Sequence, residues 1–145
     1  MTKKFTSLIG LAIALAGVFF LVEKKYILSK NPIAIIIQIF SIALMIWARI
    51  TFGMRSFHAA ANTTKGELVT NGPYRWFRHP IYASLIYFFV ASIIAFPLIE
   101  TIGAVILIIA GLMMRMLLEE KFLLAAYDGY AAYCTRTKRI IPFIF

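Results

Sequence analysis

Apolar residues in this chain fall into long uncharged blocks, and this feature most constrains its fold. The first block, Phe5 to Val22, begins after two lysines and ends at Glu23. A helix of about 20 residues crosses the hydrocarbon core of a bilayer. A basic start also fits a cleaved signal peptide, but no small-residue cleavage site precedes Lys24 and Lys25. We therefore expect a membrane span over residues 5–22.

Three further blocks predict three more spans. One opens with Pro32, which a helix tolerates in its first turn, and ends at Trp47, a typical interfacial anchor. The other two flank Pro97, which interrupts a helix and so predicts a tight hairpin. The expected spans cover residues 32–47, 81–96 and 102–118. The predicted fold class is all-α, an integral membrane bundle of about four transmembrane helices.

Composition agrees with a membrane protein and leaves room for one domain. The chain has 145 residues, of which 62% are hydrophobic and 14% charged. Soluble domains have about half apolar and about a quarter charged residues. Four spans and their connections use nearly all of residues 1–145, so we expect a single transmembrane domain.

The distribution of basic residues predicts which side of the bundle faces the cytosol. With four spans, both chain ends and the loop before the third span lie on one side. That side carries twelve of the fifteen Lys and Arg residues, and the other carries Lys24, Lys25 and Lys30. The positive-inside rule then places the basic side in the cytosol. Helix-end charges facing anionic lipid explain the positive balance, so we expect membrane lipids and no nucleic acid as partners.

No carboxylate lies in the middle of any expected span. Glu23 and Glu100 stand at span ends, and Glu67 falls in the central loop. A small proton-coupled transporter, which matches the length and the number of spans, usually has an ionisable residue at mid-membrane. A non-enzymatic membrane protein also matches the hydrophobicity, but gives no reason for two polar patches described next. These two classes are the alternatives to an enzyme.

The first polar patch precedes the third span. Asn71-Gly72-Pro73 predicts a turn leading into a short helix, and Pro80 pushes His79 out of helical geometry. His79 then sits just before a helix N-terminus, where free N–H groups favour an anion, and Arg78 strengthens that preference. An interfacial belt of Arg, His, Trp and Tyr that merely anchors a helix is the alternative interpretation.

The second patch follows the fourth span. Arg115 and Glu119 are four residues apart and share a helix face, while Glu120 points about a quarter-turn away. Two adjacent carboxylates at the mouth of a span are costly unless a partner or ligand compensates them. The alternative is a solvated helix extension that marks where the span leaves the bilayer. The hairpin topology brings this patch close to the first one.

Together the two patches resemble a known family. Gly72-Pro73-Tyr74-Arg75 and Arg78-His79-Pro80-Ile81-Tyr82, followed by Glu119-Glu120 and a Tyr-rich stretch ending in Arg139-Ile140-Ile141-Pro142, are similar to the isoprenylcysteine carboxyl methyltransferase and phospholipid methyltransferase family. The resemblance covers residues from about Phe52 onward. Ser84 stands where the family pattern has glycine, and Tyr127-Asp128-Gly129-Tyr130 replaces the usual F-G-x-E-Y.

The resemblance implies an S-adenosylmethionine-dependent methyltransferase whose cytosolic cofactor pocket is formed by the central loop, the last span and the C-terminal segment. The acceptor it implies is a lipophilic small molecule or a lipid-modified substrate, methylated on a carboxylate oxygen or on a phospholipid-type amine. Arg115 and Glu120 are the implied catalytic residues. The implied cofactor-binding residues are Tyr74, Arg78, His79, Tyr82, Glu119 and Glu120.

Other reactive side chains point to no further chemistry. His58 and His79 are isolated and do not suggest a metal site, and no metal is expected. Cys134 is the only cysteine and is expected to be an ordinary reduced thiol. A reductase-like relative is a third possibility, but a nicotinamide dinucleotide would need a larger pocket than this short chain supplies.

Overall fold

The computed structural model describes residues 3–28, 30–53, 68–142 and 144, and this part of the chain is all-α. Arg55, His58, Lys65 and Glu67 lie outside the described residues. The long helices are α1 (Lys3–Glu23), α2 (Pro32–Phe52), α3 (Pro80–Ala95) and α4 (Ile99–Ala126). A 3-10 helix, η2 (Gly72–Arg75), and a short helix, α5 (Tyr130–Arg136), complete the fold. The predicted fold class is confirmed.

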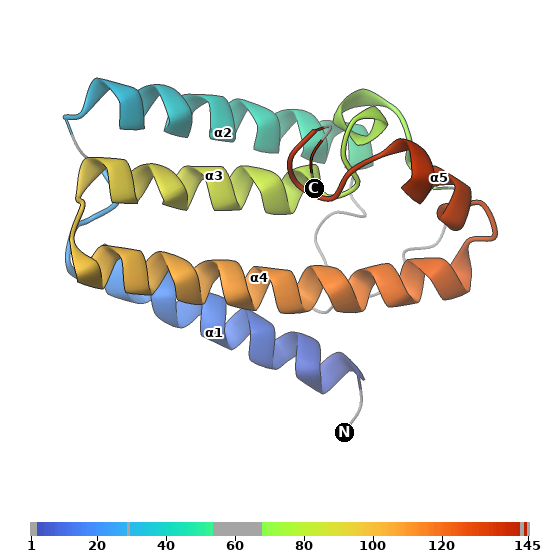
Figure 1. The fold of residues 1–145 in the computed structure, drawn as a ribbon, viewed down its shortest axis with the longest axis horizontal. Coiled ribbons are helices and arrows are strands. Elements are labelled where there is room, and N and C mark those ends of the chain that lie inside the picture. Colours follow the sequence, from blue (N-terminus) through green and yellow to red (C-terminus); the bar gives the residue numbers. More distant parts are fainter. Residues whose placement is uncertain (1–2, 29, 54–67, 143, 145) are drawn as a thin grey trace.

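The four long helices form a row in the order α2, α3, α4, α1 (Figure 1). Neighbours in the row run in opposite directions, and α1 packs against α4 rather than against α2, which follows it in the chain. The beginning of α1, the end of α4, η2 and α5 all lie at one end of the row (Figure 1). That end therefore gathers both polar patches.

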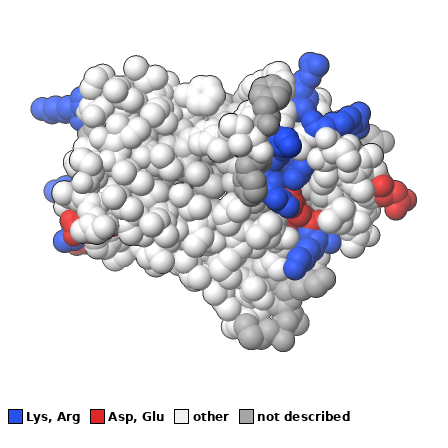
Figure 2. Space-filling view, viewed as in Figure 1, with Lys and Arg blue, Asp and Glu red and all other residues white. Residues whose placement is uncertain are grey.

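The helix row has the surface of a multi-pass membrane protein. Among the described residues, α1, α2 and α4 are long and apolar enough to cross a membrane, and α3 is a shorter apolar helix of 16 residues. Figure 2 shows Lys, Arg, Asp and Glu at the two ends of the molecule, with a broad uncharged band between them. Large apolar side chains on the long helices, such as Phe19, Ile36 and Ile50, are exposed, as lipid contact requires.

Local sequence signals explain where these helices begin and end. The Asn31 side chain caps α2 by accepting from the backbone N–H groups of Ile33 and Ala34 at 3.0 and 3.2 Å. Pro80 occupies the first turn of α3, and the chain leaves the helix at Phe96, just before Pro97. These two prolines make α3 the shortest of the four. The expected hairpin around Pro97 is present as the α3–α4 connection.

α2 and α4 extend furthest beyond the expected spans. α2 continues past Trp47 to Phe52, and α4 continues past Leu118 to Ala126. Glu, Lys, Leu and Ala follow Leu118, and all four are good helix formers, so the α4 helix outlasts its apolar stretch. The extension of α4 carries Glu119 and Glu120 beyond the bundle and toward η2 and α5.

Gly72 sets the close approach of the loop to α2. Its φ of +56° is unfavourable for other residues, and an added Cβ would lie 2.6 Å from Oγ1 of Thr51. η2 follows directly, with Pro73 in its first turn, as the sequence predicts. The loop that leads to His79 is therefore held against the end of α2.

Candidate functional site

The loop before α3 pairs with the segment after α5. Phe77 and Lys138 form an isolated parallel β-bridge. The backbone N–H of Arg78 donates to the carbonyl of Lys138 at 2.7 Å, and that of His79 donates to the carbonyl of Arg139 at 3.1 Å. Two tyrosines reinforce this pairing, because Tyr133 donates to the Tyr74 carbonyl at 2.6 Å and Tyr87 to the Ile140 carbonyl at 2.7 Å.

Three basic side chains converge on the carboxylate of Glu120. Arg78 Nε lies 3.0 Å from Oε1, and His79 Nε2 lies 3.3 Å from the same oxygen. Arg139 Nε lies 3.0 Å from the other oxygen, Oε2. Glu120 is buried, at 7% exposure, so the carboxylate has exchanged its hydration for these partners. We call Arg78, His79, Glu120 and Arg139 the Glu120 cluster.

Arg78 connects this cluster to the end of α5. Its Nη1 donates to the carbonyls of Cys134 and Thr137, at 3.0 and 2.6 Å. A guanidinium suits this position because its planar fork serves several acceptors at once. It also satisfies carbonyls that the short helix leaves without internal partners. The cluster thus ties α4, the loop before α3 and the α5 segment together.

A second group of polar residues surrounds the neighbouring carboxylate, Glu119. The hydroxyl of Tyr82 donates to Glu119 Oε2 at 2.9 Å and also interacts with the side chain of Arg115. Tyr74 lies within electrostatic range of Glu119. Glu119 is partly exposed, whereas Glu120 is buried. We call Tyr74, Tyr82, Arg115 and Glu119 the Glu119 cluster.

Arg115 reaches the Glu119 cluster from within the helix bundle. Its side chain is 7% exposed, and Nη1 donates to the backbone carbonyl of Ser7 on α1 at 3.3 Å. Ser7 itself is fully buried. A buried guanidinium is costly without partners, so the contact with α1 helps to hold Arg115 at this depth.

Burial keeps the aromatic and thiol groups around the site neutral. Desolvation raises the pKa of the Tyr74 phenol, and the charge of Glu119 raises it further. Burial also raises the pKa of the Tyr133 phenol and that of the Cys134 thiol. Cys134 is therefore less ionised than an ordinary cysteine, which fits the expected role of an unreactive thiol.

All the residues expected at the site lie at this end of the row, in two adjoining clusters. Arg78, His79 and Glu120 share one cluster, and Tyr74, Tyr82, Arg115 and Glu119 share the other. The roles expected for them remain predictions. Among the residues that the structure describes, His, Cys, Asp and Glu form no group of three or more that could hold a metal ion.

Sequence reasoning missed two contributors. Arg139 was expected only as part of a tail motif, yet it binds Glu120 directly. Arg139 directly follows the bridge residue Lys138, and this position gives no local sequence signal for the contact with Glu120. Ser7 was expected as one residue of a span, yet its carbonyl binds Arg115. The run Ser7-Leu8-Ile9-Gly10 does hint at helix packing, because small residues allow close approach of helices in membranes.

The fold and the two clusters define a multi-pass membrane protein whose polar chemistry lies at one end of an apolar helix bundle. The model of the isoprenylcysteine carboxyl methyltransferase (ICMT) family matches residues 33–125, more than half of the chain, and the protein belongs to this family. The family consists of S-adenosylmethionine-dependent methyltransferases, so the protein is an enzyme of this class. No curated protein and no solved structure matches the chain. The family match begins in α2 and ends in α4, so α1 lies outside it.

Proposed function

We propose that this enzyme methylates a lipophilic acceptor that reaches the site from the bilayer, while the cofactor enters from the cytosol. The observation that carries this proposal is the position of the Glu119 cluster, which combines a buried arginine from the apolar bundle with a partly exposed carboxylate at its end. A site at this depth is accessible both from the hydrocarbon of the bilayer and from water. Four apolar helices would serve no obvious purpose for an acceptor dissolved in water.

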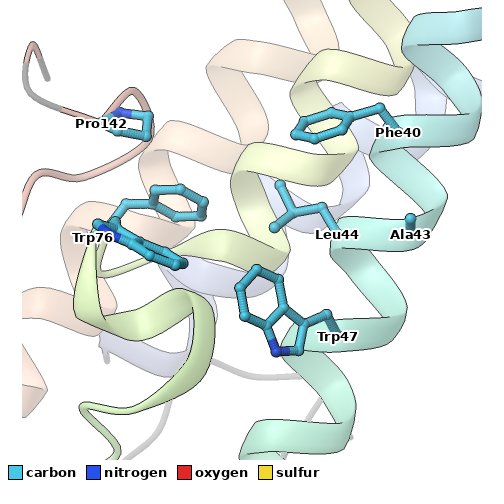
Figure 3. A pocket seen from close by; sticks show the side chains of 7 residues that line it. Phe40, Ala43, Leu44, Trp47, Trp76 and Pro142 are labelled. Carbon is cyan, nitrogen blue, oxygen red and sulfur yellow. The ribbon is translucent and has the colours of Figure 1, made fainter.

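An apolar hollow beside the site supports a lipophilic acceptor. It has a volume of about 350 Å³, within the usual range of ligand pockets. Trp47 of α2 and Trp76 of the loop lie edge to face across it, with ring centroids 5.7 Å apart (Figure 3). The lining side chains are apolar and include Phe40, Leu44, Trp47, Trp76, Phe77 and Pro142.

The hollow and the Glu120 cluster share the same stretch of backbone. Trp76 and Phe77 line the hollow, and Arg78 and His79, the next two residues, contact Glu120. Pro142 likewise follows Arg139 by three residues. One loop and one segment therefore present apolar side chains toward α2 and basic ones toward α4. This arrangement suits an amphipathic acceptor with a hydrocarbon chain and a polar head.

The chemistry of the Glu119 cluster fits S-adenosylmethionine, which supplies an activated methyl group on a sulfonium sulfur when bound. Carboxylate and phenol oxygens are suitable acceptors and donors for an amino group and ribose hydroxyls. We assign cofactor contact to Tyr74, Tyr82 and Glu119. Both oxygens of Glu120 already bind basic side chains. We therefore assign Glu120, Arg78 and His79 to shaping and positioning the wall of the cofactor pocket.

Arg115 favours a carboxylate as the methylated group. A guanidinium orients a carboxylate through paired hydrogen bonds, and its positive charge repels an amine cation. In this role Arg115 aligns one acceptor oxygen with the methyl carbon, and the Tyr82 hydroxyl, which contacts both Arg115 and Glu119, links the acceptor and cofactor sides. Little else is required of the protein beyond excluding water.

The test uses purified protein in detergent or nanodiscs with methyl-labelled S-adenosylmethionine. One arm offers a total lipid extract and the other an aqueous metabolite pool, and we expect label in the lipid arm. Alkaline treatment should then release the label as methanol, because esters hydrolyse in base whereas N-methyl groups do not. Label that withstands alkali would contradict the carboxylate assignment, and labelling mainly of the aqueous pool would contradict a lipophilic acceptor.

A pair of variants tests the hollow. Ala43 lines it, so Ala43→Trp should fill it and raise KM for the lipid acceptor about tenfold, with S-adenosylhomocysteine affinity unchanged. Ile42→Trp is the matched control, because Ile42 is an exposed neighbour on the same helix that does not line the hollow. Equal effects of the two tryptophans on KM would show that the hollow has no part in acceptor binding.

A further inference from the structure

A close contact between α1 and α4 lies one helical turn from Arg115 on α4. Gly10 of α1 faces Gly111 of α4, and a Cβ added at Gly10 would lie 2.8 Å from the Gly111 carbonyl oxygen. The same Cβ would lie 3.2 Å from Cγ of Arg115. The missing side chain at position 10 therefore leaves the space through which the stem of Arg115 passes.

Two independent contacts thus connect α1 with Arg115. One is the close approach at Gly10, where any added Cβ would crowd Cγ of Arg115, and the other is the hydrogen bond from Arg115 Nη1 to the Ser7 carbonyl at 3.3 Å. Gly10 and Ser7 are three residues apart and lie on the same face of α1. The absence of a side chain at position 10 leaves the path of the Arg115 stem open, and the Ser7 carbonyl binds the guanidinium at its end.

The rest of the interface explains why α1 itself is held rigidly. Its buried positions repeat every three or four residues, with Ala14, Gly17 and Leu21 following Gly10 toward the other end of the helix. Small residues at this spacing let two membrane helices approach closely, and van der Waals packing then holds them. A backbone carbonyl on so tightly packed a helix is a fixed acceptor.

We propose that α1, through Gly10 and the Ser7 carbonyl, positions the Arg115 guanidinium for acceptor alignment, and is thus part of the catalytic unit rather than only a membrane anchor. This inference rests on the proposed role of Arg115 in acceptor binding. It extends the functional unit beyond residues 33–125, the part matched by the family model. Gly10 is a positioning residue that acts through Arg115 and touches no substrate itself.

The test compares Gly10→Ala with Gly17→Ala. At Gly17 a Cβ would lie 2.6 Å from the Ala104 carbonyl oxygen and 2.7 Å from Cγ1 of Ile108, so this variant disturbs the same interface as strongly but two turns away from Arg115. Both variants should lower the melting temperature in detergent by similar amounts. Only Gly10→Ala should slow methylation of the lipid extract, by about tenfold in kcat. S-adenosylhomocysteine affinity should stay within about twofold for both, because cofactor contact is assigned to other residues.

A double-variant cycle separates positioning from a general structural effect. Arg115→Lys keeps the charge but loses the planar fork, so it should slow methyl transfer while sparing cofactor affinity. If Gly10 acts through Arg115, then Gly10→Ala combined with Arg115→Lys should be no slower than the slower single variant. Multiplying effects, or equal slowing by Gly17→Ala, would overturn the positioning role. Normal transfer by Arg115→Lys would instead overturn the proposed role of Arg115, and this inference with it.

Discussion

Arg139, which follows α5, donates from Nε to Oε2 of Glu120 on α4 at 3.0 Å. This ion pair uses the carboxylate oxygen that Arg78 and His79 leave free. Because Arg78 belongs to the loop before α3, a single carboxylate on α4 joins two segments from opposite sides of it in the sequence. Glu120 is therefore the point where the parts of the site are held together, and its variants should affect the whole site.

Replacing Glu120 with glutamine should both destabilise the protein and weaken cofactor binding. The change keeps the shape but leaves Arg78, whose side chain is 9% exposed, without its counter-charge. Breaking a buried ion pair in this way costs about 3 kcal/mol. We expect a melting temperature several degrees lower and S-adenosylhomocysteine affinity reduced about tenfold, measured by thermal shift and calorimetry. Glu23→Gln, an exposed residue at the other end of the row, should alter neither quantity. An unchanged melting temperature for Glu120→Gln would contradict the structural role.

Tyr82→Phe should weaken the cofactor without unfolding the protein. The hydroxyl donates to the Glu119 carboxylate at 2.9 Å, and a hydrogen bond to a charged group is worth roughly 1.5 to 3 kcal/mol. The same hydroxyl is proposed to contact the cofactor, and losing a contact of that strength corresponds to a roughly tenfold or larger decrease in S-adenosylhomocysteine affinity. Tyr87→Phe is the matched control on the same helix, because its hydroxyl donates to the Ile140 carbonyl. The control substitution should lower the free energy of unfolding by about 1 kcal/mol and leave S-adenosylhomocysteine affinity unchanged. If both phenylalanine variants bind alike, Tyr82 is not a cofactor residue.

Cys134 should react slowly with maleimide. Burial raises the pKa of its thiol, so at pH 8 a smaller fraction is thiolate than for an ordinary cysteine, and the thiolate is the reactive form. The rate should keep rising with pH beyond the ordinary thiol pKa of about 8.5. Thr135→Cys in a Cys134→Ser background is the comparison, since position 135 is exposed. Faster labelling of Cys134 than of this exposed cysteine at pH 8 would contradict the burial argument.

Both clusters should face the cytosol. Arg136 and Lys138 lie at the cluster end of the row and Lys25 at the opposite end, as the positive-inside rule requires for a cytosolic site. In a Cys134→Ser background, Arg136→Cys should resist a membrane-impermeant maleimide in intact cells and be labelled after lysis. Lys25→Cys should be labelled in intact cells. The opposite pattern would reverse the topology.

The lengths of the apolar runs and the positions of the prolines were sufficient to predict the helical bundle. Each expected span coincides with a helix, because an apolar run between charges has one stable conformation in lipid. The ends of α2 and α4 were less predictable. Helix propensity continues past Trp47 and past Leu118, so the helix end and the end of the apolar run differ there.

The site was predictable only in part, for a different physical reason. Arg78, Glu119 and Glu120 stand out locally, as charges at span ends. The pairing of Phe77 with Lys138 is a contact between distant segments that has no periodic signal, and it is this pairing that carries Arg139 to Glu120. The contact between Ser7 and Arg115 was also not predicted, because α1 packs against α4 although α2 and α3 lie between them in the sequence.

The positions of the partners of Arg78 in the chain also imply an order for the assembly of the site. At a synthesis rate of about 5–20 residues per second, Thr137, the last of these partners in the chain, follows Arg78 by roughly 3 to 12 seconds. During that interval the helices can enter the bilayer while Arg78 has only part of its final set of partners. For that time, a guanidinium in hydrocarbon would carry a high free-energy cost, whereas a guanidinium at the membrane surface remains hydrated. Because the Glu120 cluster lies at the ends of the helices, the spans can insert first and the ion pairs of the cluster can form afterwards.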